Sequence, residues 1–148
     1  MKKTGQILLV DDNLNDIELT RTALGDGAQL GEIVTARDGG EALDYLYRRG
    51  KFQDRPPGNP VVVFLDLKMP KVDGLEVLRQ MKGDASLKKI PIVMLTSSRE
   101  ETDLFKSYEL GVNAYVVKPV GFNEFVGAVR QLGTFWVSLN EPPPETTG

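Results

Sequence analysis

Acidic, hydroxyl and ammonium side chains stand at the ends of apolar runs along this sequence, where they could do chemistry. In chain order these groups are Asp11 and Asp12, Asp66, Thr96, and Lys118. Carboxylates that lie close together repel one another, and a divalent cation relieves that repulsion. Mg²⁺ prefers oxygen ligands and is typically held by one or two carboxylates together with a phosphate oxygen. These residue types therefore predict a magnesium-assisted phosphoryl transfer site.

Each group can take a defined part in such a transfer. An aspartate that accepts a phosphoryl group needs little beyond in-line positioning and neutralisation of charge on the phosphoryl oxygens. The metal ion supplies part of that neutralisation, and the compact ammonium of Lys118 supplies another part. The hydroxyl of Thr96 can donate a hydrogen bond to a phosphoryl oxygen.

Taken singly, each residue also has an ordinary structural explanation. Asp11 and Asp12 could form a turn and a helix cap, and Asp66 could be a simple loop aspartate. Thr96 could precede a helix cap, Tyr115 could be a half-buried strand residue, and the lysine before a proline could be a solvated turn. The chemical interpretation depends on the common position of the polar groups, because ligands bind beyond the carboxyl ends of parallel strands.

Five short runs with strand character alternate with helical patterns. The runs cover residues 6–10, 32–36, 61–65, 92–95 and 114–117. Three of them are continuously apolar, which is typical of central strands in a parallel sheet that is covered on both faces. The whole pattern predicts one α/β domain, βαβαβαβαβα, with right-handed crossovers.

The predicted helices follow the same alternation. Asn15 or Asp16 is expected to cap the first, and the second is expected to begin near Gly40. The third follows Asp73. The fourth starts after Ser97 and Ser98, with Glu100 and Glu101 as capping partners. Two helices are predicted to show an inward stripe, which consists of Leu14, Ile17 and Leu24 in the first and of Phe122, Phe125, Val126, Val129, Leu132 and Trp136 in the fifth.

Composition excludes several classes of protein. The chain has 148 residues, of which 41% are hydrophobic, so it can bury one domain core. It contains no cysteine and no histidine, which excludes disulfides, thiol nucleophiles, Ser-His-Asp triads and histidine-ligated zinc. A net charge of −3 provides no attraction to nucleic acid or to an anionic membrane. Without a signal-peptide pattern or a long apolar run, we expect a cytoplasmic protein.

Residues 1–139 are predicted to form the domain, and residues 140–148 (NEPPPETTG) to form a Pro-rich tail that is disordered or extended. No output domain is expected after the fifth helix. Residues 48–60 (RRGKFQDRPPGNP) are predicted to be a polar loop between the second helix and the third strand.

Four ordered motifs carry a resemblance to a known family. They are LLVDDN at 8–13, VVFLDLKMPKVDG at 62–74, IVMLTSS at 92–98 and YVVKPV at 115–120. With these motifs the chain resembles the receiver domain of two-component response regulators over nearly its whole length. The resemblance implies a flavodoxin-like, doubly wound parallel sheet of five strands in the order 2-1-3-4-5, flanked by five helices.

The resemblance also implies roles for individual residues. Asp66 matches the phosphoacceptor, Asp12 a direct Mg²⁺ ligand, and Asp11 a ligand that acts mostly through water. The backbone carbonyl of Lys68 matches the third protein ligand of the metal. In addition, Thr96 matches the family's switch hydroxyl. Tyr115 matches the aromatic residue that is coupled to it, and Lys118 matches the salt-bridging lysine.

The implied partner is a histidine kinase, since this chain lacks the histidine that would donate the phosphoryl group. The loop RPPGNP and the extended fifth helix resemble the small regulators that pair with phytochrome-type histidine kinases. The chain is expected to be no enzyme beyond Mg²⁺-dependent phosphorylation and dephosphorylation of itself. A homodimer is expected through helix four, strand five and helix five, with Phe105, Tyr108 and Phe135 as a candidate apolar patch.

Two alternatives from other classes share part of this pattern. A haloacid-dehalogenase-type phosphatase also uses an aspartyl phosphate, but it needs a second acid at the position that Lys68 occupies. A flavodoxin-like FMN carrier shares the fold, but Asp11 and Asp12 would repel the FMN phosphate.

Overall fold

The central sheet holds five parallel strands, as the sequence predicts. In the computed structural model, which describes residues 5–25 and 31–144, they are β1 (Gln6–Val10), β2 (Glu32–Ala36), β3 (Val62–Leu65), β4 (Ile92–Thr96) and β5 (Ala114–Val117). Their order across the sheet is β2-β1-β3-β4-β5. The helices are α1 (Leu14–Leu24), α2 (Gly39–Tyr47), α3 (Gly74–Lys82), α4 (Glu101–Glu109) and α5 (Phe122–Gly133). The flavodoxin-like doubly wound fold is therefore confirmed.

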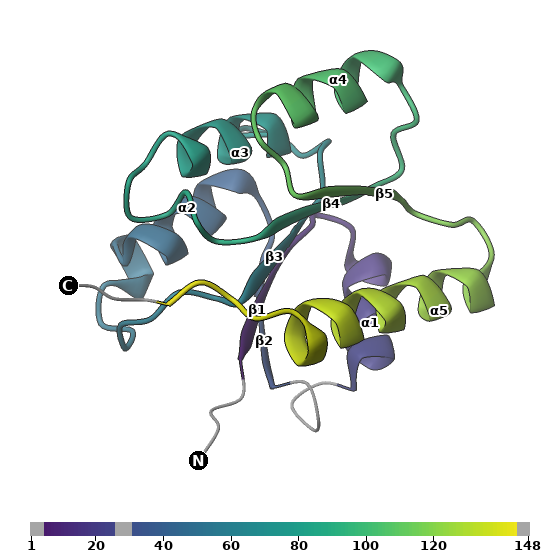
Figure 1. Cartoon of the computed structure of the whole chain (residues 1–148), viewed down its shortest axis with the longest axis horizontal. Coiled ribbons are helices and arrows are strands. Elements are labelled where there is room, and N and C mark those ends of the chain that lie inside the picture. The colour runs from purple at the N-terminus through teal and green to yellow at the C-terminus, as the bar shows by residue number, and fades with distance from the viewer. Residues whose placement is uncertain (1–4, 26–30, 145–148) are drawn as a thin grey trace.

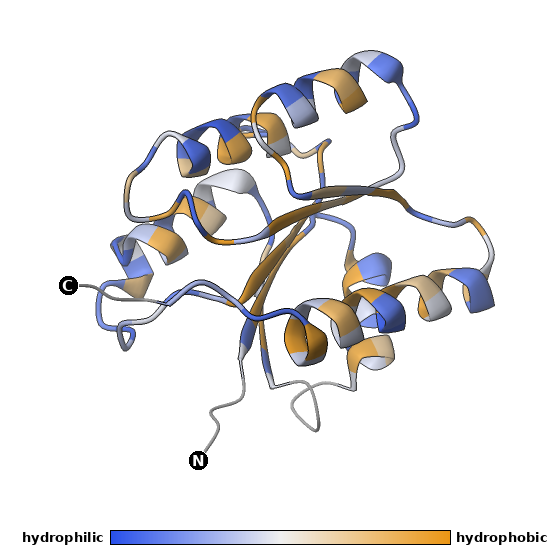
Figure 2. Ribbon diagram, in the orientation of Figure 1, coloured by the Kyte–Doolittle hydropathy of each residue, from blue (hydrophilic) through white to orange (hydrophobic). Residues whose placement is uncertain are grey.

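Helices cover both faces of the sheet (Figure 1), with α1 and α5 on one side and α2, α3 and α4 on the other. Successive strand residues point to opposite faces. In β1, Ile7 and Leu9 accordingly join the core under α1 and α5, whereas Leu8 and Val10 join the core under α2 and α3. The central strands are apolar except for Gln6 at the start of β1 and Thr96 at the end of β4, as expected for strands with both faces buried (Figure 2).

The start of α1 differs from the prediction. Asn13, rather than Asn15 or Asp16, caps the helix, and its side chain accepts the Asp16 N–H at 3.0 Å. Leu14 is 57% exposed, so the predicted inward position of this residue is wrong, while Ile17 is buried. The cap lies two residues earlier because the chain turns into the helix directly after Asp12.

The start of α4 also differs. Glu100 occupies the cap position without a capping side-chain hydrogen bond. Instead, the Ser98 hydroxyl accepts the Glu100 N–H at 3.3 Å and donates to the Asp103 carboxylate at 2.6 Å. The helix entry is thus held by a serine–aspartate pair rather than by the predicted glutamates.

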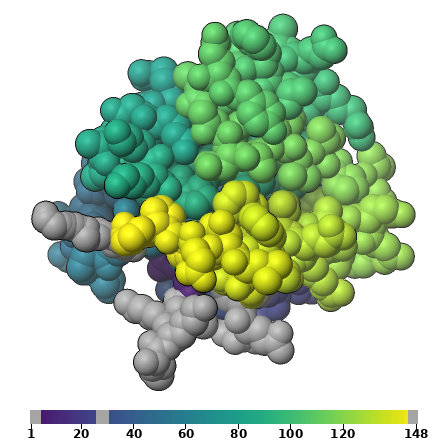
Figure 3. Space-filling view, viewed as in Figure 1, coloured from purple at the N-terminus to yellow at the C-terminus, as the bar shows by residue number. Residues whose placement is uncertain are grey.

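The chain beyond α5 continues as a π-helical segment, Thr134–Leu139. Trp136 packs against the core under α1 and α5, as predicted, whereas Phe122 is exposed and does not join the inward stripe. Phe135 lies edge-to-face on Trp136, with ring centroids 5.0 Å apart. Figure 3 shows this yellow segment lying across the near face of the molecule.

The two segments of irregular composition behave differently. Within the 48–60 loop, Arg55 stacks over the Tyr45 ring at 4.0 Å and donates from Nε to the Tyr45 carbonyl at 2.7 Å. This loop is therefore anchored to α2. In the predicted tail, residues 141–144 have no regular structure and Pro142 to Pro144 lie beside Pro60 and Pro91, while residues 145–148 fall outside the described range. Among the described residues, no helix is long and apolar enough to cross a bilayer.

Candidate functional site

The carboxyl ends of β1 and β3 bring three carboxylates together. Asp11, Asp12 and Asp66 each offer an oxygen, and these oxygens lie within 4.8 Å of one another. The two strands are neighbours, with Val10 in register with Leu65, so the residue after each strand lies at the same edge of the sheet. The Asp66 N–H extends this pairing by donating to the Val10 carbonyl at 2.9 Å.

Lys118 reaches this cluster from the end of β5. Its buried Nζ lies 2.8 Å from Asp11 Oδ2 and 3.4 Å from Asp66 Oδ2. A third carboxylate, Asp16 of α1, contacts the same Nζ at 2.8 Å. Sequence reasoning assigned Asp16 to a helix cap and missed this contact. Acids are common in the first turn of any helix, so the sequence carried no signal that set Asp16 apart.

The charges in the cluster perturb one another. Burial raises the pKa of Asp11 to about 6, although hydrogen bonds from Lys118 and the Asn13 N–H oppose the shift. Burial works against the charged form of Lys118, but hydrogen bonds to Asp11 and Asp16 outweigh it and raise the lysine pKa above its usual value. The carboxylates outnumber the ammonium that contacts them, so the site retains an excess of negative charge.

This donor set fits a small divalent cation. Opposite oxygens of an octahedral Mg²⁺ site are about 4.2 Å apart, because each bond is about 2.1 Å long. Oxygens within 4.8 Å of one another reach that geometry with a small shift or with one bridging water. A cation there would also favour the charged form of Asp11, whose pKa is raised mainly by burial.

Thr96 and Tyr115 meet at the loop that leads into α4. Thr96 ends β4, is fully buried, and its hydroxyl accepts the Ser98 N–H at 3.2 Å. The half-buried Tyr115 of β5 donates its hydroxyl to the Ser98 carbonyl at 3.1 Å. Both side chains therefore form hydrogen bonds with the backbone of the same residue, Ser98.

Lys68 lies in the loop after Asp66, and its exposed side chain extends toward α4. The ammonium lies 3.4 Å from Asp103 and 3.8 Å from Glu100. The role of the Lys68 carbonyl as a metal ligand stays a prediction.

Gly74 fixes the loop that carries Asp66. The Gly74 N–H donates to the Leu67 carbonyl at 2.8 Å. A Cβ on Gly74 would overlap the carbonyl oxygen of Asp66, so only glycine allows α3 to begin this close. Asp73 caps the helix by accepting the Glu76 N–H at 3.0 Å. The sequence reasoning used Asp73 but gave Gly74 no positioning role.

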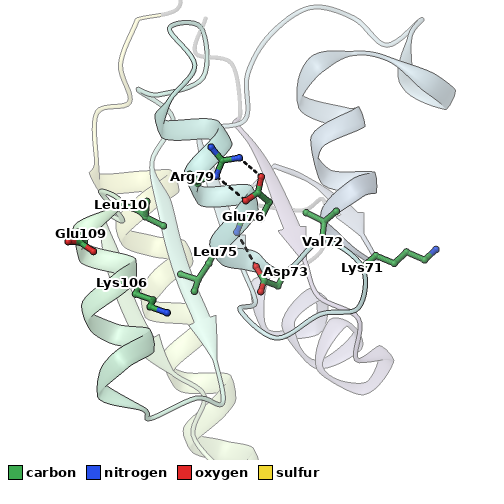
Figure 4. A pocket seen from close by; sticks show the side chains of 9 residues that line it. All are labelled: Lys71, Val72, Asp73, Leu75, Glu76, Arg79, Lys106, Glu109 and Leu110. Carbon is green, nitrogen blue, oxygen red and sulfur yellow. Dashed lines mark hydrogen bonds and ion pairs between the residues drawn. The ribbon is translucent and has the colours of Figure 1, made fainter.

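A groove of about 510 Å³ lies between α3 and α4 (Figure 4). Asp11, Asp12 and Asp66 are not among its lining residues. Its nine lining residues are Lys71, Val72, Asp73, Leu75, Glu76, Arg79, Lys106, Glu109 and Leu110. Glu76 and Arg79 pair with each other within this groove, so part of its charge is already compensated.

Comparison with known proteins identifies the family to which this fold belongs. The family model described as "response regulator receiver domain" matches residues 7–130. The chain belongs to this family. Response regulator Rcp1 of Synechocystis sp. (strain ATCC 27184 / PCC 6803 / Kazusa) is 37% identical over 131 residues, which are 88% of each chain.

Solved structures of receiver domains extend this similarity. The phosphorylated cyanobacterial phytochrome response regulator RcpA is 40% identical, with a TM-score of 0.90 over 95% of this chain and 99% of that chain. The Mn²⁺-bound form of Rcp1 is 36% identical, with a TM-score of 0.87 over 94% and 99%. The bacteriophytochrome response regulator AtBRR is 61% identical, with a TM-score of 0.74 over 95% and 100%. The chain is thus a receiver domain of two-component systems, related to phytochrome response regulators.

Proposed function

We propose that this receiver domain accepts a phosphoryl group on Asp66 from the phosphohistidine of a histidine kinase. The Mg²⁺ needed for the reaction would be held by Asp11, Asp12, Asp66 and the Lys68 carbonyl. The observation that carries the proposal is the meeting of three carboxylates and the Lys118 ammonium at one edge of the sheet.

Asp66 is the carboxylate best placed to act as the acceptor. Both oxygens of the buried Asp11 are engaged at short distance, Oδ1 by the Asn13 N–H at 2.9 Å and Oδ2 by Lys118 at 2.8 Å. Asp66 Oδ1 accepts the Leu67 N–H at 2.8 Å, but its Oδ2 has only the longer contact with Lys118, at 3.4 Å. Of the four carboxylate oxygens of Asp11 and Asp66, Asp66 Oδ2 therefore has the longest hydrogen bond.

The transfer forms a bond between Asp66 Oδ2 and phosphorus as the bond from phosphorus to the donor nitrogen breaks. When bound, Mg²⁺ supplies charge neutralisation to the acceptor and phosphoryl oxygens. Lys118 donates to a phosphoryl oxygen from its position 3.4 Å from Asp66. Thr96 would turn its hydroxyl to donate to the phosphoryl group, and its contact with Ser98 would transmit that change to the loop before α4.

Phosphorylation of variants with a radiolabelled small phosphodonor, acetyl phosphate, tests the assignment. We expect Mg²⁺-dependent labelling of the wild type and none of Asp66→Asn. Asp54→Asn is the matched control, since Asp54 is exposed and lies in the 48–60 loop. Unchanged labelling of Asp66→Asn would remove this residue from the role. In this proposal the chain is no enzyme beyond the phosphorylation and dephosphorylation of itself.

The kinase is proposed to dock beside the site on exposed apolar side chains. Leu14 follows Asp12 in sequence, and Val120 and Phe122 follow Lys118, with exposures of 57%, 97% and 63%. The contact between Lys118 and Asp16 joins α1, which carries Leu14, to the loop after β5, which carries Val120. The relatives named as phytochrome and bacteriophytochrome response regulators favour a phytochrome-type kinase.

Docking and chemistry can be separated by experiment. Phe122→Ala should slow phosphotransfer from the kinase while leaving labelling by acetyl phosphate unchanged. Leu139→Ala, at an exposed apolar residue after α5, should leave both rates unchanged. Equal kinase transfer to Phe122→Ala and the wild type would exclude this surface.

A homodimer through α4, β5 and α5 is the second part of the partner proposal. Phe105 and Tyr108 are exposed on α4, and β5, at the edge of the sheet, is only partly buried along its length. Sedimentation at high micromolar concentration should show a dimer, and a monomer with and without beryllofluoride would exclude it. The cytoplasmic location and the absence of a nucleic acid partner stay predictions.

A further inference from the structure

Lys118 is shared unequally among three carboxylates. Its Nζ lies 2.8 Å from both Asp11 and Asp16 but 3.4 Å from Asp66. In this state the ammonium is therefore held closer to an acid of α1 than to the proposed phosphoacceptor. The pairing joins residues 102 positions apart in sequence and connects α1 to the loop after β5.

We infer that Asp16 is a positioning residue that holds Lys118 in the unphosphorylated state and gives it up when a phosphoryl group is present on Asp66. This inference rests on the proposed function, because it requires Lys118 to engage the phosphoryl oxygens. It adds to that function a residue on α1 whose contact is broken by the reaction.

The donor capacity of the ammonium limits how many acceptor oxygens Lys118 can serve at once. An ammonium has three N–H donors, and the three carboxylates already use them. Phosphorylation replaces the Asp66 carboxylate with an acyl phosphate that carries about −1.5 to −2 charges in total, together with new acceptor oxygens. The donor that now contacts Asp66 Oδ2 can pass to one phosphoryl oxygen, and Lys118 can donate to a second phosphoryl oxygen only by leaving Asp11 or Asp16.

Asp16 is the partner that can leave with the smallest loss. Its side chain is 24% exposed, whereas that of Asp11 is 3% exposed. A released Asp16 carboxylate becomes hydrated, while a released Asp11 carboxylate would stay buried without its ammonium partner, which is strongly unfavourable.

Release of Asp16 changes the first turn of α1. This turn also carries Leu14, an exposed member of the proposed kinase-docking surface, and its cap joins Asn13 to Asp16. Breaking the contact with Lys118 removes one connection between α1 and the loop that carries Val120. Phosphoryl transfer would thereby weaken the surface on which the donor kinase sits and favour its departure.

Binding of the phosphoryl analogue beryllofluoride, in the presence of Mg²⁺, tests this role. Asp16→Asn should bind beryllofluoride about tenfold more tightly than the wild type, because the unphosphorylated state loses one charge-assisted hydrogen bond. Glu18→Gln is the matched control: Glu18 is exposed on the same helix and the change in charge is identical. Its affinity should stay within about twofold of the wild type, as expected for an exposed surface charge.

Amide chemical shifts provide a second readout, first in the wild type and then in the variant. In the wild type, beryllofluoride should shift the amides of residues 14–17, and in Asp16→Asn those amides should already lie near the bound position. Equal or weaker affinity of Asp16→Asn, or unshifted wild-type amides at 14–17 on saturation, would overturn the inference alone. A wild type that does not bind beryllofluoride with Mg²⁺ would overturn the proposed function itself.

Discussion

Replacing Lys118 by methionine isolates the energetic role of the ammonium in the cluster. The side chain is 6% exposed and contacts three carboxylates, of which Asp11 and Asp66 are themselves buried. Removing one partner of a buried ion pair costs about 3–5 kcal/mol because it leaves an uncompensated buried charge. The partial exposure of Asp16 places the expected loss near the lower end, about 3 kcal/mol at pH 7.5 without Mg²⁺.

The loss should depend on pH and on metal in a defined direction. The pKa of Asp11 in the folded protein is about 6, which is above its usual value. Ionisation of Asp11 therefore already lowers the stability of the fold at any pH above the usual pKa of this side chain. Lys118 lowers this pKa, and it should therefore rise further in the variant. The difference in stability between wild type and variant should shrink as the pH falls from 7.5 to 5, because the carboxylate becomes protonated. Millimolar Mg²⁺ should restore part of the loss by binding the folded state.

Urea denaturation followed by circular dichroism measures the effect. With a slope of about 2 kcal/mol per molar urea, a loss of 3 kcal/mol lowers the midpoint by about 1.5 M. Lys88→Met, at an exposed lysine, should leave the free energy of unfolding unchanged within about 0.5 kcal/mol. A Lys118→Met variant as stable as the wild type at pH 7.5, or one equally destabilised at pH 5 and pH 7.5, would refute this electrostatic account.

Three further predictions concern the metal, the acceptor loop and the C-terminal segment. Mg²⁺ affinity, measured by calorimetry, should weaken from pH 7.5 to pH 5.5, since protons compete for Asp11, whose pKa is about 6; equal affinities would contradict a metal bound through it. Gly74→Ala should lower the free energy of unfolding by about 1–3 kcal/mol, because its Cβ meets the Asp66 backbone. A Cβ on Gly127, in α5, would meet open space, so Gly127→Ala should raise the free energy of unfolding by about 0.5–1 kcal/mol. If both variants were destabilised, the cause would not be the contact between the new Cβ and the Asp66 backbone. Trp136→Ala should cost about 1.5–3 kcal/mol because this ring packs on the core, and a loss no larger than that of Phe135→Ala in thermal melts would count against that packing.

The sequence by itself determined the strands and showed that the chemistry lies at their carboxyl ends. All five predicted strands match the observed ones within one residue at each end. Apolar runs and their alternation with helical patterns are local signals, so they survive without knowledge of the fold. Because parallel strands align their carboxyl ends, the residues that follow them, Asp11, Asp66 and Lys118, were predictable as one cluster.

Only the tertiary structure decided which additional side chains take part. Asp16 meets Lys118 across 102 positions, and Gly74 makes room for the backbone of Asp66. Ser98 links Thr96, Tyr115 and α4 through contacts that depend on how the loop packs. In sequence these residues look like ordinary cap and turn residues, because their contacts arise only when α1, α3 and the loops after β4 and β5 are brought to the same edge of the sheet.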